Sequence, residues 1–272
     1  MPWLVSESFG SGGEHLSAPD DHALAADLAE RAGRLLLDLR AQGGDPGALR
    51  NAGDRQSHEF LMEALAKARP EDAVLSEEGI DDKARLTADR VWIVDPLDGT
   101  REFGEPGRVD WAVHVALWAR DASAGAGDLI AGAVALPAQG RTLSTTPATD
   151  RADQVARRPL RMVVSRSRAS QLVKDVAARI NADLVPCGSA GAKVATVITG
   201  ENDVYLHSGG FYEWDTAAPV AVARQHGFHV SRIDGAPVAY NRQDPLLPDI
   251  LVCRPAIASL LLNAIREATH AI

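Results

Sequence analysis

The sequence has few cysteines and lacks the long apolar runs of secreted or membrane-spanning proteins. Only two of its 272 residues are cysteines, Cys187 and Cys253, and they form no CxxC pattern. We therefore expect reduced thiols rather than a disulfide. No apolar run approaches ~18 residues, which excludes a transmembrane helix. Residues 1–19 lack a basic region followed by an apolar run, so we expect no secretory signal and a cytoplasmic location.

Positive charge is also scarce. The chain has 28 lysines and arginines against 37 aspartates and glutamates, which gives a net charge of −9. An acidic chain of this size is a poor default binder of nucleic acid or of anionic membranes. We therefore expect neither as a partner. If the substrate is anionic, something other than the overall charge must attract it.

The length is that of one large domain or two lobes of ordinary size, with enough residues for a core. Apolar residues recur at helical spacing over 20–42 and about 54–69, and short β-like segments follow between 73 and 144. After a polar segment at 147–159, strand and helix patterns alternate to the end. This order predicts an α+β lobe followed by an α/β lobe. The predicted units are a flexible tail at 1–19, a first lobe at 20–150 and a second lobe at 151–272.

The sharpest motif is Asp95-Pro96-Leu97-Asp98-Gly99-Thr100, directly after the apolar segment 91–94. Two carboxylates three residues apart offer the hard oxygen ligands that Mg²⁺ prefers, and the bent Pro96-Leu97 segment can turn a carbonyl toward the same ion. If Gly99 and Thr100 open a helical turn, their N–H groups point at an incoming phosphate. The alternative is a polar turn in which Asp98 caps a helix.

Three other acidic positions accompany this motif. Glu77 and Glu78 follow a strand-like segment, and only one of them can join a metal cluster because adjacent side chains in a strand face opposite ways. Taken alone, the pair is a solvated acidic turn. Asp215, in Glu213-Trp214-Asp215, and Asp54, at a predicted helix start, are each explained equally well as helix caps.

As an ordered set, Asp54, Glu77-Glu78, Asp95-x-x-Asp98-Gly99-Thr100 and Trp214-Asp215 resemble the lithium-sensitive, magnesium-dependent phosphatases of the inositol monophosphatase superfamily. The resemblance extends from about residue 20 to 270. It implies a two-lobed αβαβα layered sandwich of the inositol monophosphatase/fructose-1,6-bisphosphatase type, with the active site between the lobes. It also implies two or three Mg²⁺ ions, with Mn²⁺ as a substitute. Homodimers are common in the superfamily, and the sequence does not decide this point.

The resemblance assigns roles residue by residue. The positions that match metal ligands are Glu77, Asp95, the Leu97 carbonyl, Asp98 and Asp215. Asp54 and Thr100 match the pair that orients and deprotonates the attacking water, and the Gly99 and Thr100 amides would hold phosphate oxygens. The physical logic agrees, because clustered carboxylates repel one another unless cations neutralise them. The implied reaction is direct hydrolysis without a phosphoenzyme.

Two features bear on the substrate. Arg101-Glu102-Phe103 is similar to the CysQ-type 3′-phosphoadenosine-5′-phosphate phosphatases, whereas inositol monophosphatases usually have Thr-Asn-Phe. The turn from Gly188 to Lys193 ends in a lysine, as is common in the nucleotidase branches. A substrate with two phosphates needs a cation away from the metals, which Lys193 or Arg101 could supply. Alternatively, Lys193 is a solvated lysine on a helix face, and Arg101 pairs with Glu102 or with the acidic cluster.

Three further substrate contacts are predicted from the resemblance: Ser189, Glu213 and Tyr240. Glu213 matches a position that contacts substrate hydroxyls. Tyr240 could stack on adenine, or it could be a core tyrosine. His226 and His229 have no metal-like partners and are expected to be structural.

The implied activity is Mg²⁺-dependent removal of the 3′-phosphate of adenosine 3′,5′-bisphosphate, giving AMP and phosphate, in sulfur metabolism. A broader inositol-1-phosphate or fructose-1,6-bisphosphate phosphatase is the alternative within the same class. An interaction module of the SuhB type is an alternative from another class, and the net charge of −9 disfavours direct RNA binding by such a module.

Overall fold

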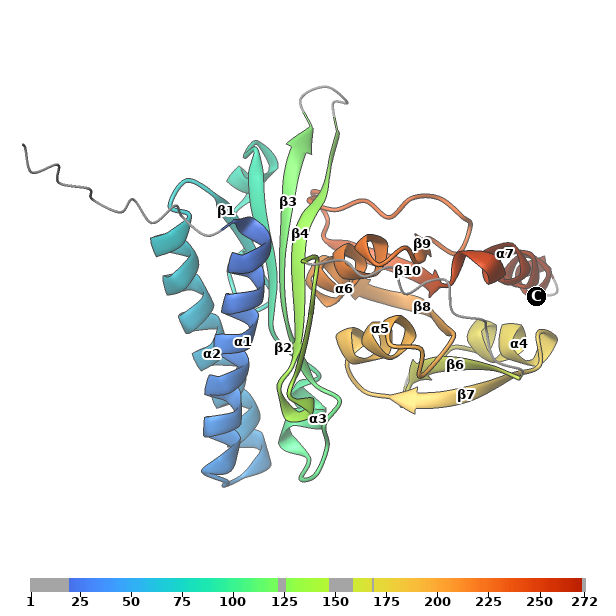
Figure 1. Cartoon of the computed structure of the whole chain (residues 1–272), viewed down its shortest axis with the longest axis horizontal. Helices are drawn as coiled ribbons and strands as arrows, with labels where there is room; N and C mark the ends of the chain where they lie inside the picture. The colour runs from blue at the N-terminus through green and yellow to red at the C-terminus, as the bar shows by residue number, and fades with distance from the viewer. Residues whose placement is uncertain (1–19, 122–125, 147–158, 168, 271–272) are drawn as a thin grey trace, which may run out of the picture.

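The computed structural model describes residues 20–121, 126–146, 159–167 and 169–270. These residues form five layers, in which two sheets alternate with three pairs of helices (Figure 1). The predicted αβαβα sandwich is confirmed. The predicted tail at 1–19 and the predicted lobe boundary at 150/151 lie outside the described residues.

The first sheet carries helices α1 (Asp21–Ala41) and α2 (Pro46–Ala68) on its outer face. Its strands follow chain order, with β1 and β2 parallel and the other pairs antiparallel. They are β1 (Ala73–Ser76), β2 (Arg90–Asp98), β3 (Ala112–Asp121), β4 (Ala126–Leu136) and β5 (Arg141–Ser144). Along β2, Trp92 and Val94 pack toward the outer helices, whereas Val91 and Ile93 join the core between the sheets. Burial on both faces explains the continuous apolar run of this strand.

The second sheet has the order β7-β6-β8-β10-β9. Its strands are β6 (Leu160–Ser165), β7 (Ala182–Cys187), β8 (Val204–Tyr212), β9 (His229–Ser231) and β10 (Leu246–Cys253). Strand β6 pairs in parallel with β7 and β8, and the other pairs are antiparallel. Helices α5 (Ala190–Ile198) and α6 (Glu213–Gln225) fill the layer between the sheets. Helices α4 (Gln171–Arg179) and α7 (Pro255–His270) cover the outer face.

Helix α2 begins eight residues before its predicted start at residue 54. The Asp45 side chain accepts a hydrogen bond from the Ala48 amide, and Pro46 occupies the first turn. Both features favour a helix start at this point. Asp54 therefore lies inside α2, and the alternative that it caps the helix is wrong.

The layers bring the ends of several parallel strands together. Strand β2 ends at Asp98, β6 at Ser165 and β7 at Cys187. Asp98, Ser165 and the residues that follow the three strand ends line one cleft, as expected for ligand sites at the carboxyl ends of parallel strands. Cys187 and Cys253 both carry free thiols. Among the described helices, none is long and apolar enough to cross a membrane.

Gly53 allows α2 to approach the turn that follows β2. A Cβ atom at Gly53 would lie 2.9 Å from Leu97 Cδ2 and 2.9 Å from Phe103 Cε1. At Gly47, in the same helix, a Cβ atom would lie 3.1 Å from Oδ1 of the exposed Asp45, the oxygen that accepts the Ala48 amide, and 3.9 Å from an Arg50 nitrogen. The two glycines therefore differ in packing, although both lie in one helix.

We expect Gly53→Ala to lower the free energy of unfolding by about 1–3 kcal/mol, because overpacking outweighs the better helix propensity of alanine. The control variant Gly47→Ala should be neutral or should stabilise by up to about 1 kcal/mol. Urea unfolding followed by circular dichroism measures both values. Equal effects of the two substitutions would contradict the role assigned to Gly53.

Candidate active site

Asp95 and Asp98 both face the cleft because β2 is irregular between them. On the neighbouring strand β3, His114 lies opposite Asp95 and Ala112 lies opposite Asp98, so three steps on β2 match two on β3. Residues three apart in a regular strand point to opposite faces, and one extra residue restores a common face. The prediction of two adjacent carboxylates therefore depends on this bulge. Both side chains are buried.

Asp215 joins them from the first turn of α6. Its Oδ2 accepts a hydrogen bond from the amide of Tyr212, the N-cap residue, at 2.7 Å, so Asp215 supports the helix start from inside α6 and is not itself the N-cap. The same carboxylate also lies beside Asp95 and Asp98, and one oxygen from each of the three lies within 4.8 Å of the others. Support of the helix start and membership of an acidic cluster are therefore compatible in one residue.

Glu77 approaches this cluster from the end of β1. Its amide donates to the Val94 carbonyl at 3.4 Å, which continues the pairing of β1 with β2. Its side chain lines the cleft and shares a hydrogen bond with Asp95. Glu78 is exposed and is not among the described residues that line the cleft, but its charge raises the pKa of both Asp54 and Glu77.

The electrostatics of the cluster favour a cation. Burial, followed by the charges of Glu77, Asp98 and Asp215, raises the pKa of Asp95 well above its usual value. Burial of the Glu77 carboxyl group, with the charge of Asp215, raises its pKa to about 7. Carboxyl groups with raised pKa values keep their protons unless a bound cation replaces them. The donor set consists of carboxylate oxygens, so it fits a hard divalent cation.

Unlike Asp95, Asp98 has neighbouring groups that stabilise its negative charge. Burial raises the pKa of Asp98, but His114, Lys193 and the Ser189 hydrogen bond outweigh this effect and lower it to about 2. The Ser189 hydroxyl donates to Asp98 Oδ2 at 2.5 Å, the Gly191 amide donates at 2.7 Å, and His114 Nε2 lies 3.1 Å away. The fold thus holds Asp98 ionised and fixed in orientation.

Two of these contacts were missed or assigned differently from the sequence. His114 is a buried polar residue in the apolar strand β3, and this was the only local signal. The prediction for Ser189 was a substrate contact. Its hydroxyl accepts from the Ala192 amide at 2.9 Å in addition to binding Asp98, so Ser189 lines the cleft with its hydroxyl already engaged.

Asp54 reaches the cleft through Thr100. The Thr100 hydroxyl lies 3.2 Å from Asp54 Oδ1 and 3.1 Å from the Leu97 carbonyl oxygen. Burial, followed by the charge of Glu78, raises the pKa of Asp54 to about 6 despite the hydrogen bond from Thr100. The preceding Gly99 has a φ of 87° and caps the short helix α3 (Thr100–Gly104), a left-handed conformation that favours glycine.

The cleft has a volume of about 380 Å³ and is lined from both sheets. It brings together ten of the predicted site residues: Glu77, Asp95, Leu97, Asp98, Gly99, Thr100, Arg101, Ser189, Lys193 and Asp215. Asp54 lies behind Thr100. The clustering of these distant segments agrees with the sequence-based expectation of a single site.

Glu213 and Tyr240 are not among the described residues that line this cleft, and both are buried, so their substrate contacts stay a prediction. Glu213 is fully buried, and its two oxygens accept the amides of Asn241 and Arg242 at 2.7 and 2.8 Å. Tyr240 is a core tyrosine. Glu213 precedes Asp215 by two positions, which are about 200° apart around a helix, so the two side chains face different ways.

The two predicted cations are in different environments. Lys193 is buried rather than solvated, and its Nζ donates to the carbonyls of Gly188 and, at 2.9 Å, Ser189. The alternative of a solvated lysine is therefore wrong. Arg101 has a side chain that is 61% exposed, and it pairs with Glu105 at 3.3 Å. The alternative pairing with Glu102 or with the acidic cluster is also not observed for Arg101 among the described contacts.

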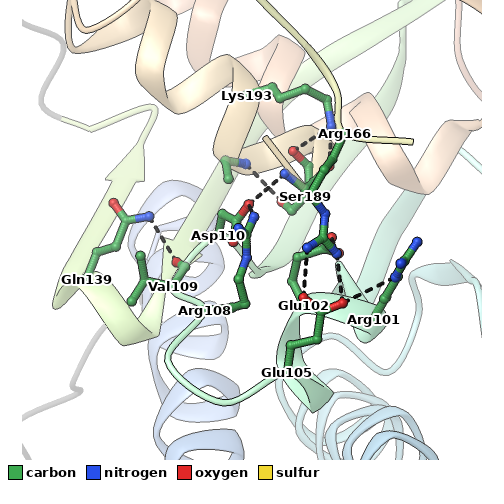
Figure 2. Close-up of polar contacts among 12 residues, drawn as sticks. Arg101, Glu102, Glu105, Arg108, Val109, Asp110, Gln139, Arg166, Ser189 and Lys193 are labelled. Carbon is green, nitrogen blue, oxygen red and sulfur yellow. Dashed lines mark hydrogen bonds and ion pairs between the residues drawn. The ribbon is translucent and has the colours of Figure 1, made fainter. Parts of the chain in front are cut away.

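A third cation, Arg166, was missed. It follows β6 in the segment Ser165-Arg166-Ser167, all three residues of which line the cleft. Its guanidinium forms ion pairs with Glu102 and Glu105 of the first half of the chain (Figure 2). An arginine between two serines after an apolar strand was the local signal available, and the partners were too distant in sequence to be inferred.

Comparison with known proteins gives matches along nearly the whole chain. A model of the inositol monophosphatase family matches residues 23–270. A 3′-phosphoadenosine 5′-phosphate phosphatase of Mycobacterium leprae (strain TN) is 48% identical over 254 residues, which cover 91% of this chain and 94% of the relative.

Two solved structures show the same fold. Inositol monophosphatase II of Staphylococcus aureus MSSA476 has a TM-score of 0.76 at 20% identity, covering 91% of this chain and 96% of that one. CysQ of Bacteroides thetaiotaomicron, a bacterial member of the inositol monophosphatase family, has a TM-score of 0.70 at 26% identity, covering 86% and 96%. The five-layer architecture is thus shared with these proteins.

The stabilisation provided by a divalent cation should increase with pH. The pKa values of Asp54 and Glu77, raised to about 6 and about 7, mean that their protonation stabilises the cation-free fold below pH ~4. This contribution is lost as pH rises through ~6–7. A cation that replaces the protons restores stability. We expect the Tm gain caused by Mg²⁺ to grow between pH ~5 and ~8 in scanning calorimetry.

The variant Asp95→Asn is the matched control, since asparagine has nearly the shape of protonated aspartic acid but cannot ionise. At the upper end of this pH range it should show a Tm without cation at least as high as that of the wild type, and little gain from Mg²⁺. A Tm gain independent of pH, or one retained in this variant, would contradict a cation site among these carboxylates.

Proposed function

The chain belongs to the inositol monophosphatase family, and on this basis we propose that it is a Mg²⁺-dependent phosphatase. Its proposed substrate is adenosine 3′,5′-bisphosphate, from which it removes the 3′-phosphate to give AMP and phosphate. The observation that carries this proposal is the 48% identity across 94% of a relative named 3′-phosphoadenosine 5′-phosphate phosphatase. The acidic cluster in the cleft supports the chemistry.

We propose that the cations are held by Glu77, Asp95, Asp98, Asp215 and the carbonyl of Leu97. Carboxylate and carbonyl oxygens are the ligands that Mg²⁺ prefers, and Mn²⁺ accepts similar donors. Bound cations would neutralise the cluster, lower the pKa of the attacking water and stabilise charge on the transferring phosphoryl group. The proximity of the three aspartate oxygens, within 4.8 Å, supports this assignment.

Asp54 and Thr100 are proposed to handle the proton of the attacking water. With a pKa of about 6, the Asp54 carboxyl is mostly ionised at neutral pH and close enough to that pH to accept a proton. Thr100, 3.2 Å from Asp54, can accept a hydrogen bond from the water while donating its own proton to the carboxylate. A proton can thus pass from water to Asp54 through the Thr100 hydroxyl.

The turn after β2 is proposed to hold the phosphate that is cleaved. Gly99 and Thr100 line the cleft beside the acidic cluster, so their amides lie where phosphate oxygens would bind. Asp98 has its Oδ2 engaged by Ser189 and Gly191, which keeps this turn from reorienting when an anion arrives. Direct attack by water on phosphorus would then form the new P–O bond as the bond to the 3′-oxygen breaks, with no covalent enzyme intermediate. The departing 3′-oxygen takes up a proton from solvent water to give the 3′-hydroxyl of AMP, and Asp54 returns its proton to solvent. We place the reaction in the cytoplasm, where the free thiols of Cys187 and Cys253 would persist.

The purified protein with Mg²⁺ should release phosphate from adenosine 3′,5′-bisphosphate at least ~100-fold faster, in kcat/KM, than from inositol 1-phosphate. Asp95→Asn should reduce turnover by at least ~100-fold while the far-ultraviolet circular dichroism spectrum is retained. Equal or reversed rates would favour the broader phosphatase. RNA binding in a gel shift that survives Asp95→Asn, together with no turnover in the wild type, would favour an interaction module.

A further inference from the structure

We propose that Arg166 binds the second phosphate of the substrate, the one that is not hydrolysed, and that Glu105 occupies its guanidinium until the substrate arrives. This inference rests on the proposed bisphosphate substrate and adds the residue that selects it. Both phosphates of such a substrate sit on one ribose. The second phosphate must therefore find a cation within the same cleft of about 380 Å³.

Three lysine or arginine side chains line the cleft among the described residues: Arg101, Arg166 and Lys193. Lys193 already donates to two backbone carbonyls, and burial lowers its pKa. Arg101 is 61% exposed, and its recorded ion pair is a single contact with Glu105. Arg166 is only 26% exposed and is held on both sides. It is thus the cation with a fixed position and a forked donor geometry.

The contacts of Arg166 resemble those that a phosphate would make. Its Nη1 and Nη2 donate to the two oxygens of Glu105 at 2.7 and 2.9 Å, and Nη2 also donates to Glu102 Oε1 at 2.7 Å (Figure 2). The Arg166 amide donates to the Cys187 carbonyl at 3.2 Å, which anchors the backbone of the loop. Paired donors of this kind bind carboxylate and phosphate in the same geometry.

The two glutamates differ in how firmly they are held. Glu102 is only 8% exposed and packs against Gly188, where a Cβ atom would lie 2.4 Å from Glu102 Cγ. Glu105 is 37% exposed and lies at the end of α3, where Arg101 also contacts it. A solvated carboxylate gives up an ion pair at little cost, whereas a buried one does not. Glu102 therefore orients Arg166, and Glu105 is the replaceable partner.

The position of Glu102 connects the two proposed phosphate sites. Glu102 follows Thr100 by two residues in α3, so the residue that orients Arg166 is part of the turn proposed to hold the hydrolysed phosphate. The two phosphate positions are thus linked through one short helix from the first sheet and one loop from the second. A substrate carrying both phosphates would contact both.

The test compares adenosine 3′,5′-bisphosphate with adenosine 3′-monophosphate, which lacks the second phosphate. In Arg166→Gln, we expect the ratio of kcat/KM for the bisphosphate to that for the monophosphate to fall by about 10- to 100-fold, the loss of a charge-assisted pair. The control Arg161→Gln removes an arginine at the other end of β6, where it contacts the Glu201 carbonyl. It should leave the ratio unchanged.

Glu105→Gln provides a second variant with an effect of opposite sign. Removing the competing charge should lower KM for the bisphosphate by about two- to fivefold. An ion pair that only joins the two halves of the protein would instead make both variants worse. An unchanged ratio in Arg166→Gln, or a raised KM in Glu105→Gln, would overturn the inference. A wild-type protein that does not hydrolyse the bisphosphate would overturn the proposed function itself.

Discussion

Mutual repulsion among clustered carboxylates, two of them buried, is the constraint on which the rest of the site depends. Asp95, Asp98 and Asp215 come from a bulged strand and from the capped start of a helix, and their oxygens lie within 4.8 Å of one another. The protein compensates Asp98 with His114 and hydrogen bonds, but the pKa values of Asp95 and Glu77 remain raised. The fold thus tolerates a charge imbalance that bound cations would remove.

Because of this local charge imbalance, the net charge of −9 does not by itself argue against an anionic substrate. The acidic residues of the cleft need not repel an anionic substrate, since they can recruit the cations that attract it. On the other side of the cleft, Arg166 is paired with Glu102 and Glu105, so its positive charge is balanced in the free protein. Under the two proposals above, the cleft would bind anionic groups in two places, at the cations and at Arg166.

Site residues that lie close together in the sequence could be predicted more readily than residues that only the fold brings together. The motif from Asp95 to Thr100 was informative because strand, turn and ligands are contiguous, and family resemblance connected it to Asp54, Glu77 and Asp215. Arg166 was missed because its partners Glu102 and Glu105 are far from it in the sequence, and His114 was missed because its contact with Asp98 depends on the irregular register of β2 against β3. Glu213 and Tyr240 lie outside the cleft lining because proximity to a site residue in the sequence does not determine which face of a helix or loop points inward.

The most direct test of cation-mediated anion binding is a calorimetric titration of the protein with inorganic phosphate, with and without Mg²⁺. Cation recruitment predicts that Mg²⁺ strengthens phosphate binding by at least about 10-fold and, by linkage, that phosphate strengthens Mg²⁺ binding by the same factor. Asp95→Asn should abolish this coupling. Equal phosphate affinity in the presence of Mg²⁺ and of a chelator would contradict the account.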